Sequence, residues 1–166
     1  MPVTSSGSAK VTLPTDDQIL ITREFDAPKH LVYKAFTTPE LVKRWWHANR
    51  GEMTVAEIDL RVGGAWRYVM IADGMEVGFH GEYLEIVENE RVVSTETFEG
   101  LPEGVSEEDG TTVNTATFAE TDGRTTLTLL VQAPSKETRD AIIDSGMEAG
   151  LQDALDNLEQ VAISLG

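Results

Sequence analysis

The C-terminal stretch of the chain, residues 135–165, decides its fold. It reads SKETRDAIIDSGMEAGLQDALDNLEQVAISL from Ser135 to Leu165. Apolar residues in this stretch recur every three or four positions, which places them on one face of a helix: Met147, Leu151, Leu155, Leu158, Ala162 and Leu165. Because that face needs an apolar partner, we expect one long helix packed across a sheet made by the preceding strands.

Two glycines, Gly146 and Gly150, interrupt the helical pattern. A glycine inside a helix costs about 1 kcal/mol relative to alanine, so each position needs a reason. One interpretation is close packing, or a break that starts a second helical segment at Ser145. The other is room left beneath the helix for a bound molecule. Ser135 has the chemistry of an N-cap for the helix.

The preceding hundred residues have the pattern of short strands joined by tight turns. Asp73-Gly74 and Asp122-Gly123 are strong turn signals, because glycine adopts positive φ at no steric cost. Seven strands are predicted, at residues 19–25, 53–60, 64–71, 76–87, 91–98, 112–119 and 124–132. The sequence therefore predicts an α+β fold with an antiparallel sheet.

The remaining segments connect and flank these strands. Two short helices are predicted after the first strand, at residues 29–36 and from Thr38 to about Trp46. Residues 1–18 show little periodicity and are predicted to be a flexible tail before a single domain at residues 19–166. The acidic segment from Glu99 to Gly110 is predicted to be a surface loop, either a plain insertion or a contact for a partner.

Composition narrows the class of protein. A chain of 166 residues with 40% apolar content forms one globular domain with one core. The absence of cysteine excludes disulfides, a thiolate nucleophile and a cysteine metal site. Because the sequence has neither a signal-peptide pattern nor an apolar run long enough to cross a bilayer, we expect a cytoplasmic protein without a membrane partner.

The net charge of −16 makes nucleic acid an unfavourable partner, since phosphates would be repelled. The excess lies in the second half, where residues 84–166 hold four basic and eighteen acidic side chains. This half forms either a solvated acidic face that maintains solubility or a surface that attracts a cationic ligand or a protein partner.

Several motifs together resemble one known family. They are Phe25-Asp-Ala-Pro28, the segment from Thr38-Pro-Glu to Trp45-Trp46, Leu60-Arg-Val-Gly-Gly-Ala-Trp66, Gly81-Glu-Tyr-Leu-Glu-Ile86 followed by Glu90-Arg91, and Ser145-Gly-Met-Glu-Ala-Gly150. Their order is similar to that of bacterial single-domain proteins related to the C-terminal domain of the activator of Hsp90 ATPase, within the START-like or Bet v 1-like (SRPBCC) superfamily. Leu151 departs from the pattern, because many relatives have tryptophan there.

The resemblance implies a helix-grip fold: a curved seven-stranded antiparallel sheet around the long C-terminal helix, with two short helices after the first strand. It implies three functions, of which the first is our main hypothesis. The protein would hold a small hydrophobic or aromatic molecule between helix and sheet, act as a polyketide cyclase or aromatase, or serve as an Hsp90-related interaction module. We expect a monomer or weak homodimer.

Strand alternation selects candidate residues for the ligand site. An outward Arg67 turns Trp66, Tyr68 and Met70 inward. Phe79, Gly81 and Tyr83 share a face, which we expect inside unless a bulge at Gly78 or Gly81 reverses it. Glu96 and Phe98 share another face, and Glu96 is a buried carboxylate only if that face points inward. Residues expected to close the hollow are Trp45 or Trp46, Met147 and Leu151, although the same side chains suit a packed core.

No strong catalytic motif is present. The three histidines, His30, His47 and His80, lack metal-ligand spacing, so we expect no metal and no cofactor. A cyclase needs an acid or base beside its substrate, and the weak candidates are His80, Glu96 and Tyr68.

Overall fold

The computed structural model describes residues 9–100, 106 and 110–166. Its core is an eight-stranded antiparallel sheet with strand order β1-β2-β8-β7-β6-β5-β4-β3. The strands are β1 (Lys10–Thr12), β2 (Gln18–Phe25), β3 (Glu52–Ile58), β4 (Ala65–Ala72), β5 (Met75–Val87), β6 (Arg91–Phe98), β7 (Thr111–Thr121) and β8 (Arg124–Gln132). The helices are α1 (Lys29–Thr37), α2 (Pro39–Val42), α3 (Lys136–Asp144) and α4 (Met147–Ser164).

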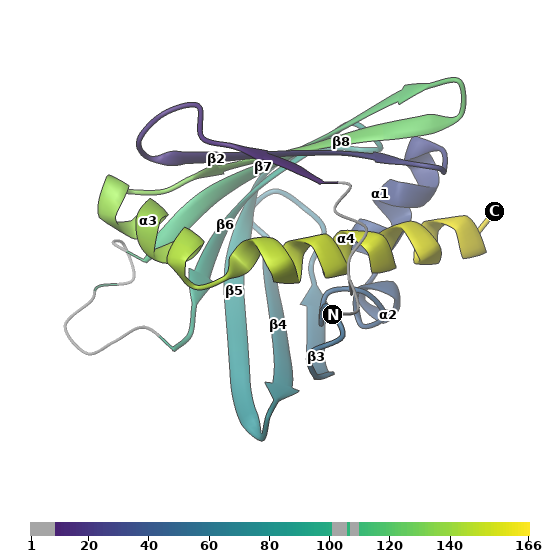
Figure 1. Cartoon of the computed structure of the whole chain (residues 1–166). Helices are drawn as coiled ribbons and strands as arrows, with labels where there is room; N and C mark the ends of the chain where they lie inside the picture. The colour runs from purple at the N-terminus through teal and green to yellow at the C-terminus, as the bar shows by residue number, and fades with distance from the viewer. Residues whose placement is uncertain (1–8, 101–105, 107–109) are drawn as a thin grey trace, which may run out of the picture.

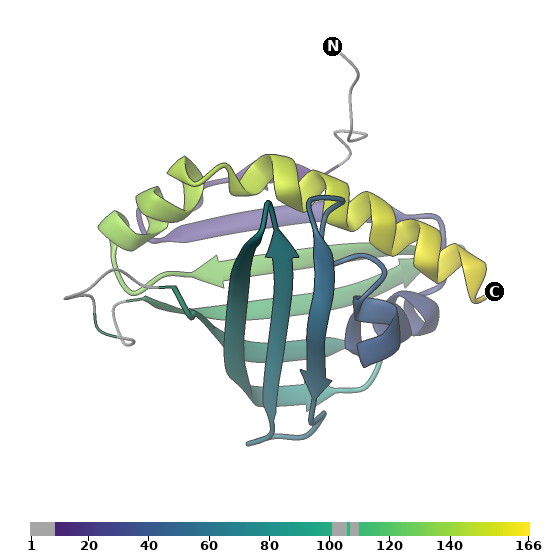
Figure 2. The same ribbon diagram turned by 90° about the horizontal axis from the view of Figure 1, so that it is seen from below.

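The sheet is strongly curved, and α4 crosses its open side (Figure 1). Strands β2 and β8 lie on one side of the helix, and strands β3–β5 lie on the other. The view from below shows α1 and α2 at the end of the molecule that holds the C-terminus (Figure 2). This is the helix-grip arrangement expected from the sequence, and it gives the sheet a concave face turned toward α4.

The structure contains one strand more than the sequence predicted. Strand β1 lies inside the segment predicted to be a flexible tail, and it pairs with β2 from Lys10↔Thr22 to Thr12↔Leu20. Three residues are too short for an alternating pattern to be recognised, so only the pairing reveals the strand. The rest of that prediction falls partly on residues 1–8, which lie outside the described residues.

The predicted long helix is broken into α3 and α4 by Gly146. This residue has φ of 82°, in the left-handed region that glycine adopts without strain. Ser135 does cap α3, because its Oγ accepts a hydrogen bond from the Thr138 backbone N–H at 3.1 Å. The first interpretation of Gly146, a break, is therefore correct, although α4 begins at Met147. A Cβ on Gly150 would meet only the Arg50 guanidinium, at 4.0 Å, so no close packing requires a glycine at this position.

The core lies between α4 and the sheet. Leu155 and Leu158 of α4 are buried, as are Phe118 of β7 and Leu127 of β8. Each large aliphatic side chain in such a position contributes about 1.5–3 kcal/mol through burial. In the described residues, no helix has the length and apolarity needed to cross a membrane.

Candidate functional site

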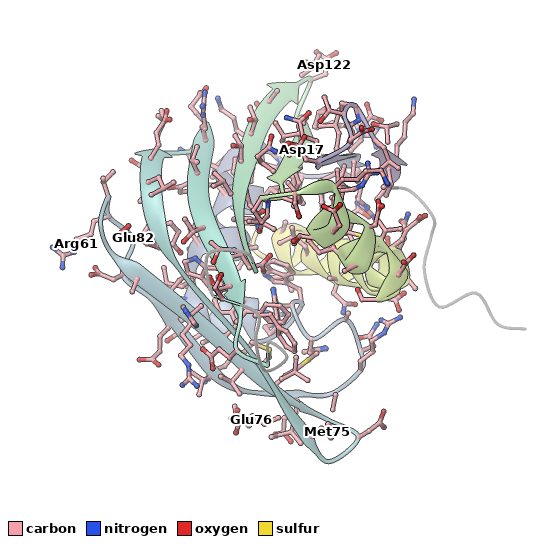
Figure 3. The ribbon with its side chains drawn as sticks, turned by 90° about the vertical axis from the view of Figure 1, so that its left-hand side faces the viewer. Asp17, Arg61, Met75, Glu76, Glu82 and Asp122 are labelled. Atoms are coloured by element: carbon pink, nitrogen blue, oxygen red, sulfur yellow. The ribbon has the colours of Figure 1, made fainter. Side chains whose placement is uncertain are left out.

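The concave face is built first from β4 and β5. Trp66 and Tyr68 of β4 are 6% and 8% exposed and belong to the core, as predicted. Arg67, between them, points to the outer face, where its guanidinium donates two hydrogen bonds of 2.9 Å to Glu99. Figure 3 shows Arg61 and Glu82 pointing away from α4 on that outer side.

The face of β5 is also the predicted one. Phe79 pairs with Tyr68 on β4, and Phe79↔Phe98 and Tyr83↔Ser94 keep one register along β6. The irregularity in this ladder falls after Tyr83, beyond these positions, and does not reverse the face. Phe79, Gly81 and Tyr83 therefore share the concave face.

Gly81 permits a tryptophan side chain to cross its strand. The Trp66 indole Nε1–H reaches over β5 and donates to the Thr95 carbonyl of β6 at 3.0 Å. A Cβ at position 81 would overlap that carbonyl oxygen and lie 2.5 Å from the indole nitrogen. The Glu82 backbone N–H turns to the Thr95 hydroxyl instead, at 2.9 Å. The bridge fixes the position of the indole on the concave face.

Five aromatic rings form one continuous group on this face, which we call the aromatic cluster: Trp46, Trp66, Tyr68, Phe79 and Phe98. The centroids of neighbouring rings are 4.7 Å apart for Trp66 and Tyr68 and 5.4 Å for Trp46 with both Tyr68 and Phe79. Phe79 and Phe98 are 5.1 Å apart. Phe98 is 37% exposed and Phe79 is half-buried, so one end of the cluster is open to solvent.

Glu96 lies on the concave face beside this cluster. It pairs with Thr112 on β7, and its Oε1 accepts a hydrogen bond of 3.1 Å from the Asn114 amide. The Thr112 hydroxyl in turn donates to the side-chain Oδ1 of Asn114 at 3.0 Å. The sequence left the direction of Glu96 open and did not single out Asn114. Continuing the alternation Phe118, Ala116 down β7 reaches Asn114 on the same inner face.

Burial changes the proton affinity of the polar groups here. It raises the pKa of the Glu96 carboxyl, while the hydrogen bond from Asn114 acts in the opposite direction. Burial also raises the pKa of Tyr68 well above its ordinary value, with smaller contributions from Tyr83 and from the Glu96 charge. Burial raises the pKa of Tyr83 as well. Tyr68 and Tyr83 are therefore neutral hydrogen-bonding groups at ordinary pH.

Helices α3 and α4 face the concave side of the sheet. Met147 and Leu151 of α4 and Ile142 and Ile143 of α3 are half-buried and pack against the core. Met70 of β4 is also half-buried against the core, on the side of the sheet. The two isoleucines were not singled out from the sequence. The left-handed backbone at Gly146 separates α3, which carries the two isoleucines, from α4.

Two predicted residues lie elsewhere. Trp45 is 6% exposed, stacks on Phe36 at 5.8 Å and donates from its indole to the Ala35 carbonyl at 2.9 Å, so it belongs to the packing of the short helical region. His80 is on the outer face, where its Nδ1 lies 3.0 Å from Glu99. The trio of His80, Glu96 and Tyr68 is therefore divided between the two faces of the sheet.

The described residues form two surface hollows. One, of about 490 Å³, lies over β3–β5 beside charged residues such as Glu57, Asp59 and Arg67, and Trp66 is the member of the aromatic cluster that lines it. The other, of about 480 Å³, is lined by charged residues of β1, β2 and the C-terminal part of α4, including Arg23 and Glu159. Neither is the hollow expected between α4 and the sheet, where the structure has a half-open wall of aromatic and polar side chains.

The other predicted features give few further candidates. Within residues 9–100, 106 and 110–166, no group of three His, Asp or Glu side chains is placed to hold a metal ion. The acidic segment from Glu99 to Gly110 lies mostly outside the described residues. Its first residue, Glu99, is held by Arg67 and His80, and the Arg67 hydrogen bonds chiefly lower the pKa of its carboxyl.

Comparison with known proteins gives one family. Residues 26–162 match the model of the family described as Activator of Hsp90 ATPase homolog 1-like protein. No curated protein matches the chain. Similar solved structures include a Rhodobacter sphaeroides protein with TM-score 0.84 and 22% identity, over 94% of this chain and 99% of that one. Protein CV1439 from Chromobacterium violaceum has TM-score 0.76 and 29% identity over 89% and 98%. An AHSA1-like protein from Aeromonas hydrophila has TM-score 0.66 and 22% identity over 89% and 94%.

Proposed function

This chain belongs to the Activator of Hsp90 ATPase homolog 1-like family, and from that premise we propose that it binds a small hydrophobic or aromatic molecule on its concave face. The domain of this family is a START-like one, a fold that typically binds hydrophobic ligands. The ligand would lie against the aromatic cluster, with Met147 and Leu151 on the helical side and Glu96 and Tyr68 as polar contacts.

The observation that carries the proposal is the exposure of apolar side chains on a face that is turned toward a helix. Phe98 is 37% exposed, and Phe79, Met70, Met147 and Leu151 are half-buried. Each Å² of apolar surface left in water costs about 25 cal/mol. A ligand that covered these side chains would remove that cost, and sites of this composition suit small molecules.

Two methionine methyl groups would report on the proposed site, and a third serves as an internal control. Met70 and Met147 are half-buried against the core, whereas Met75 is 70% exposed at the tip of the β4–β5 hairpin (Figure 3). In protein labelled with ¹³C-methyl methionine, we expect 1-naphthalenemethanol to shift the Met70 and Met147 signals and leave the Met75 signal in place. Equal shifts at all three, or none at Met70 and Met147 with a panel of naphthyl, biphenyl and alkyl probes, would contradict the proposal.

A pair of truncations tests which surface the ligand covers. Phe98→Ala removes a ring from the open end of the cluster, and we expect the dissociation constant of 1-naphthalenemethanol to rise about tenfold, as for a lost aromatic contact. Leu84→Ala is the control, because Leu84 is a similarly exposed apolar residue of β5, 43% exposed, outside the wall. An equal loss of affinity in both variants would show that the probe binds exposed apolar surface without a specific site.

A further inference from the structure

We infer that the ligand carries a positively charged amine, which Glu96 holds beside the rings of the aromatic cluster. The inference rests on the proposed function and specifies its ligand class. It begins from the position of Glu96, a carboxyl group on the concave face with its Oε1 already hydrogen-bonded to Asn114.

Glu96 lacks a positive partner within the described part of the chain. No ion pair joins it to a lysine, arginine or histidine there, and no basic group affects its pKa. Its Oε2 accepts no hydrogen bond from any described residue, so Asn114 satisfies only one side of the carboxyl. An ionised carboxylate in a half-buried position without a counter-ion is unfavourable. A ligand ammonium would supply both the missing charge and the missing donor.

One basic side chain is buried on the inner face of the described sheet, and it is already neutralised. Arg23 of β2 is 3% exposed and makes ion pairs with Asp156 at 2.6 Å and Glu159 at 3.4 Å. Its guanidinium also lies 4.6 Å from the centre of the Phe25 ring. The inner positions of β4, β5, β6 and β7 around Glu96 are aromatic, aliphatic or uncharged polar. The charge that a ligand meets on this wall is therefore negative.

The rings beside Glu96 have the chemistry that a cation requires. Phe98 is two residues away on the same face of β6, and the Glu96 charge is close enough to Tyr68 to raise the pKa of its phenol. Aromatic faces attract ammonium groups by about 0.5–2 kcal/mol, depending on burial. The net charge of −16 also raises the local concentration of cations around the protein. Charge and ring chemistry thus favour the same ligand.

A neutral ligand would use Glu96 differently, and this difference can be measured. A protonated Glu96 could donate a hydrogen bond to a carbonyl oxygen, and such a ligand would bind more weakly as the pH rises through the pKa of Glu96. An ammonium ligand needs the ionised form, so its affinity is lost as the pH falls through that pKa. Because burial raises this pKa, binding of the cation also releases a proton in that pH range.

The experiment compares 1-naphthylmethylamine, 1-naphthalenemethanol and 1-naphthoate by calorimetry between pH 5 and pH 8. At pH 7 we expect the amine to bind about tenfold more tightly than the alcohol, and the naphthoate to bind weakest. We expect the affinity for the amine to fall toward pH 5, with a heat of binding there that depends on the buffer because a proton is released.

Glu96→Gln keeps the side-chain shape and the carbonyl that accepts from Asn114, but it removes the charge. We expect the affinity for the amine to fall about tenfold and its pH dependence to disappear, and the affinity for the alcohol to change less than the affinity for the amine. Glu82→Gln is the matched control, because it removes one charge from the outer face of the neighbouring strand and should change neither affinity (Figure 3).

Three results would overturn the inference. Equal affinity for amine and alcohol would leave the proposed function standing and refute the cationic ligand class. An equal effect of Glu96→Gln and Glu82→Gln on the amine would assign the preference to net charge instead of to Glu96. If neither these three probes nor the biphenyl and alkyl probes of the panel moved the Met70 and Met147 signals, the inference and the proposed function would fall together.

Discussion

At the scale of single residues, the site depends on a few positions where a side chain is either present or excluded. Gly81 is the clearest case, since its missing side chain lets the Trp66 indole reach the Thr95 carbonyl. The sequence indicated that Gly81 is special but linked it to a bulge. The actual reason is a hydrogen bond between Trp66 of β4 and Thr95 of β6, which crosses the strand that holds Gly81. Such a contact between distant residues leaves no local pattern in the sequence.

Alanine at position 81 should therefore break the bridge and destabilise the protein. We expect Gly81→Ala to lower the free energy of unfolding by about 2–4 kcal/mol, because the new Cβ overlaps the Thr95 carbonyl and displaces the indole. Gly150→Ala is the control, since it lies in α4 with open space around it. It should stabilise the protein by up to about 1 kcal/mol. Urea unfolding measures both changes, and destabilisation of similar size in both would refute the role given to Gly81.

Residue orientation was predictable where alternation was clear. Arg67 between Trp66 and Tyr68 identifies the inner face of β4 from the sequence. The two faces of β6 each combine apolar and polar residues, so the direction of Glu96 could be decided only by its ladder partner Thr112. Adjacent Trp45 and Trp46 lie beyond the end of α2, where no helical period separates an inner from an outer residue.

At the scale of elements, strand positions were predicted well and the ends of helices less well. The seven predicted strands correspond to β2–β8, because turn signals and alternation agreed in this part of the chain. Strand β1 was not predicted, and the break between α3 and α4 was one of the interpretations that the sequence left open. These features depend on contacts between distant segments or on a single backbone angle. Ala9, the residue directly before β1, is hydrogen-bonded to α4.

This link between β1 and α4 can be tested through Gln152. Its amide accepts from the Ala9 N–H at 3.0 Å and donates to the Ala9 carbonyl at 2.8 Å. Gln152→Met keeps the volume but leaves two buried backbone groups unpaired, which costs about 1–3 kcal/mol each. We expect the backbone amides of β1 to exchange with solvent roughly ten- to a hundredfold faster, with β6 unchanged.

A second substitution on the same helix separates this effect from a general change in α4. Gln160 is exposed, so Gln160→Met alters the same chemistry at a position without that contact. Hydrogen exchange followed by NMR should show no change in β1 for this variant. Unaltered exchange of β1 in Gln152→Met would show that pairing with β2 alone holds the strand.

At the scale of the whole molecule, the sequence predicted the architecture more completely than the site. The α+β fold, with an antiparallel sheet and a packed terminal helix, follows from local patterns that agree with one another, and the resemblance to a family implied its helix-grip form. The site depends on which side chains fill the space between α4 and the sheet. That is a property of packing, and the sequence left both a hollow and a filled core open. The structure has an intermediate arrangement, with a buried core and a half-exposed aromatic wall.

The net charge of −16 is also a property of the whole molecule, and it predicts how salt affects stability. Repulsion among the excess carboxylates opposes the compact state, and salt screens this repulsion over a Debye length that falls from about 30 Å at 0.01 M to about 8 Å at 0.15 M. Surface ion pairs such as Lys136–Asp140 are weakened as well, but each contributes only about 0–1 kcal/mol.

We therefore expect Tm at pH 7.5 to rise as NaCl increases from 0.01 to 0.3 M. Near pH 5, close to the isoelectric point of about 4.4, the same titration should have little effect, because few uncompensated charges remain. An equal rise in Tm at both pH values would mean that the salt acts through general solvent effects and that charge repulsion is not the cause.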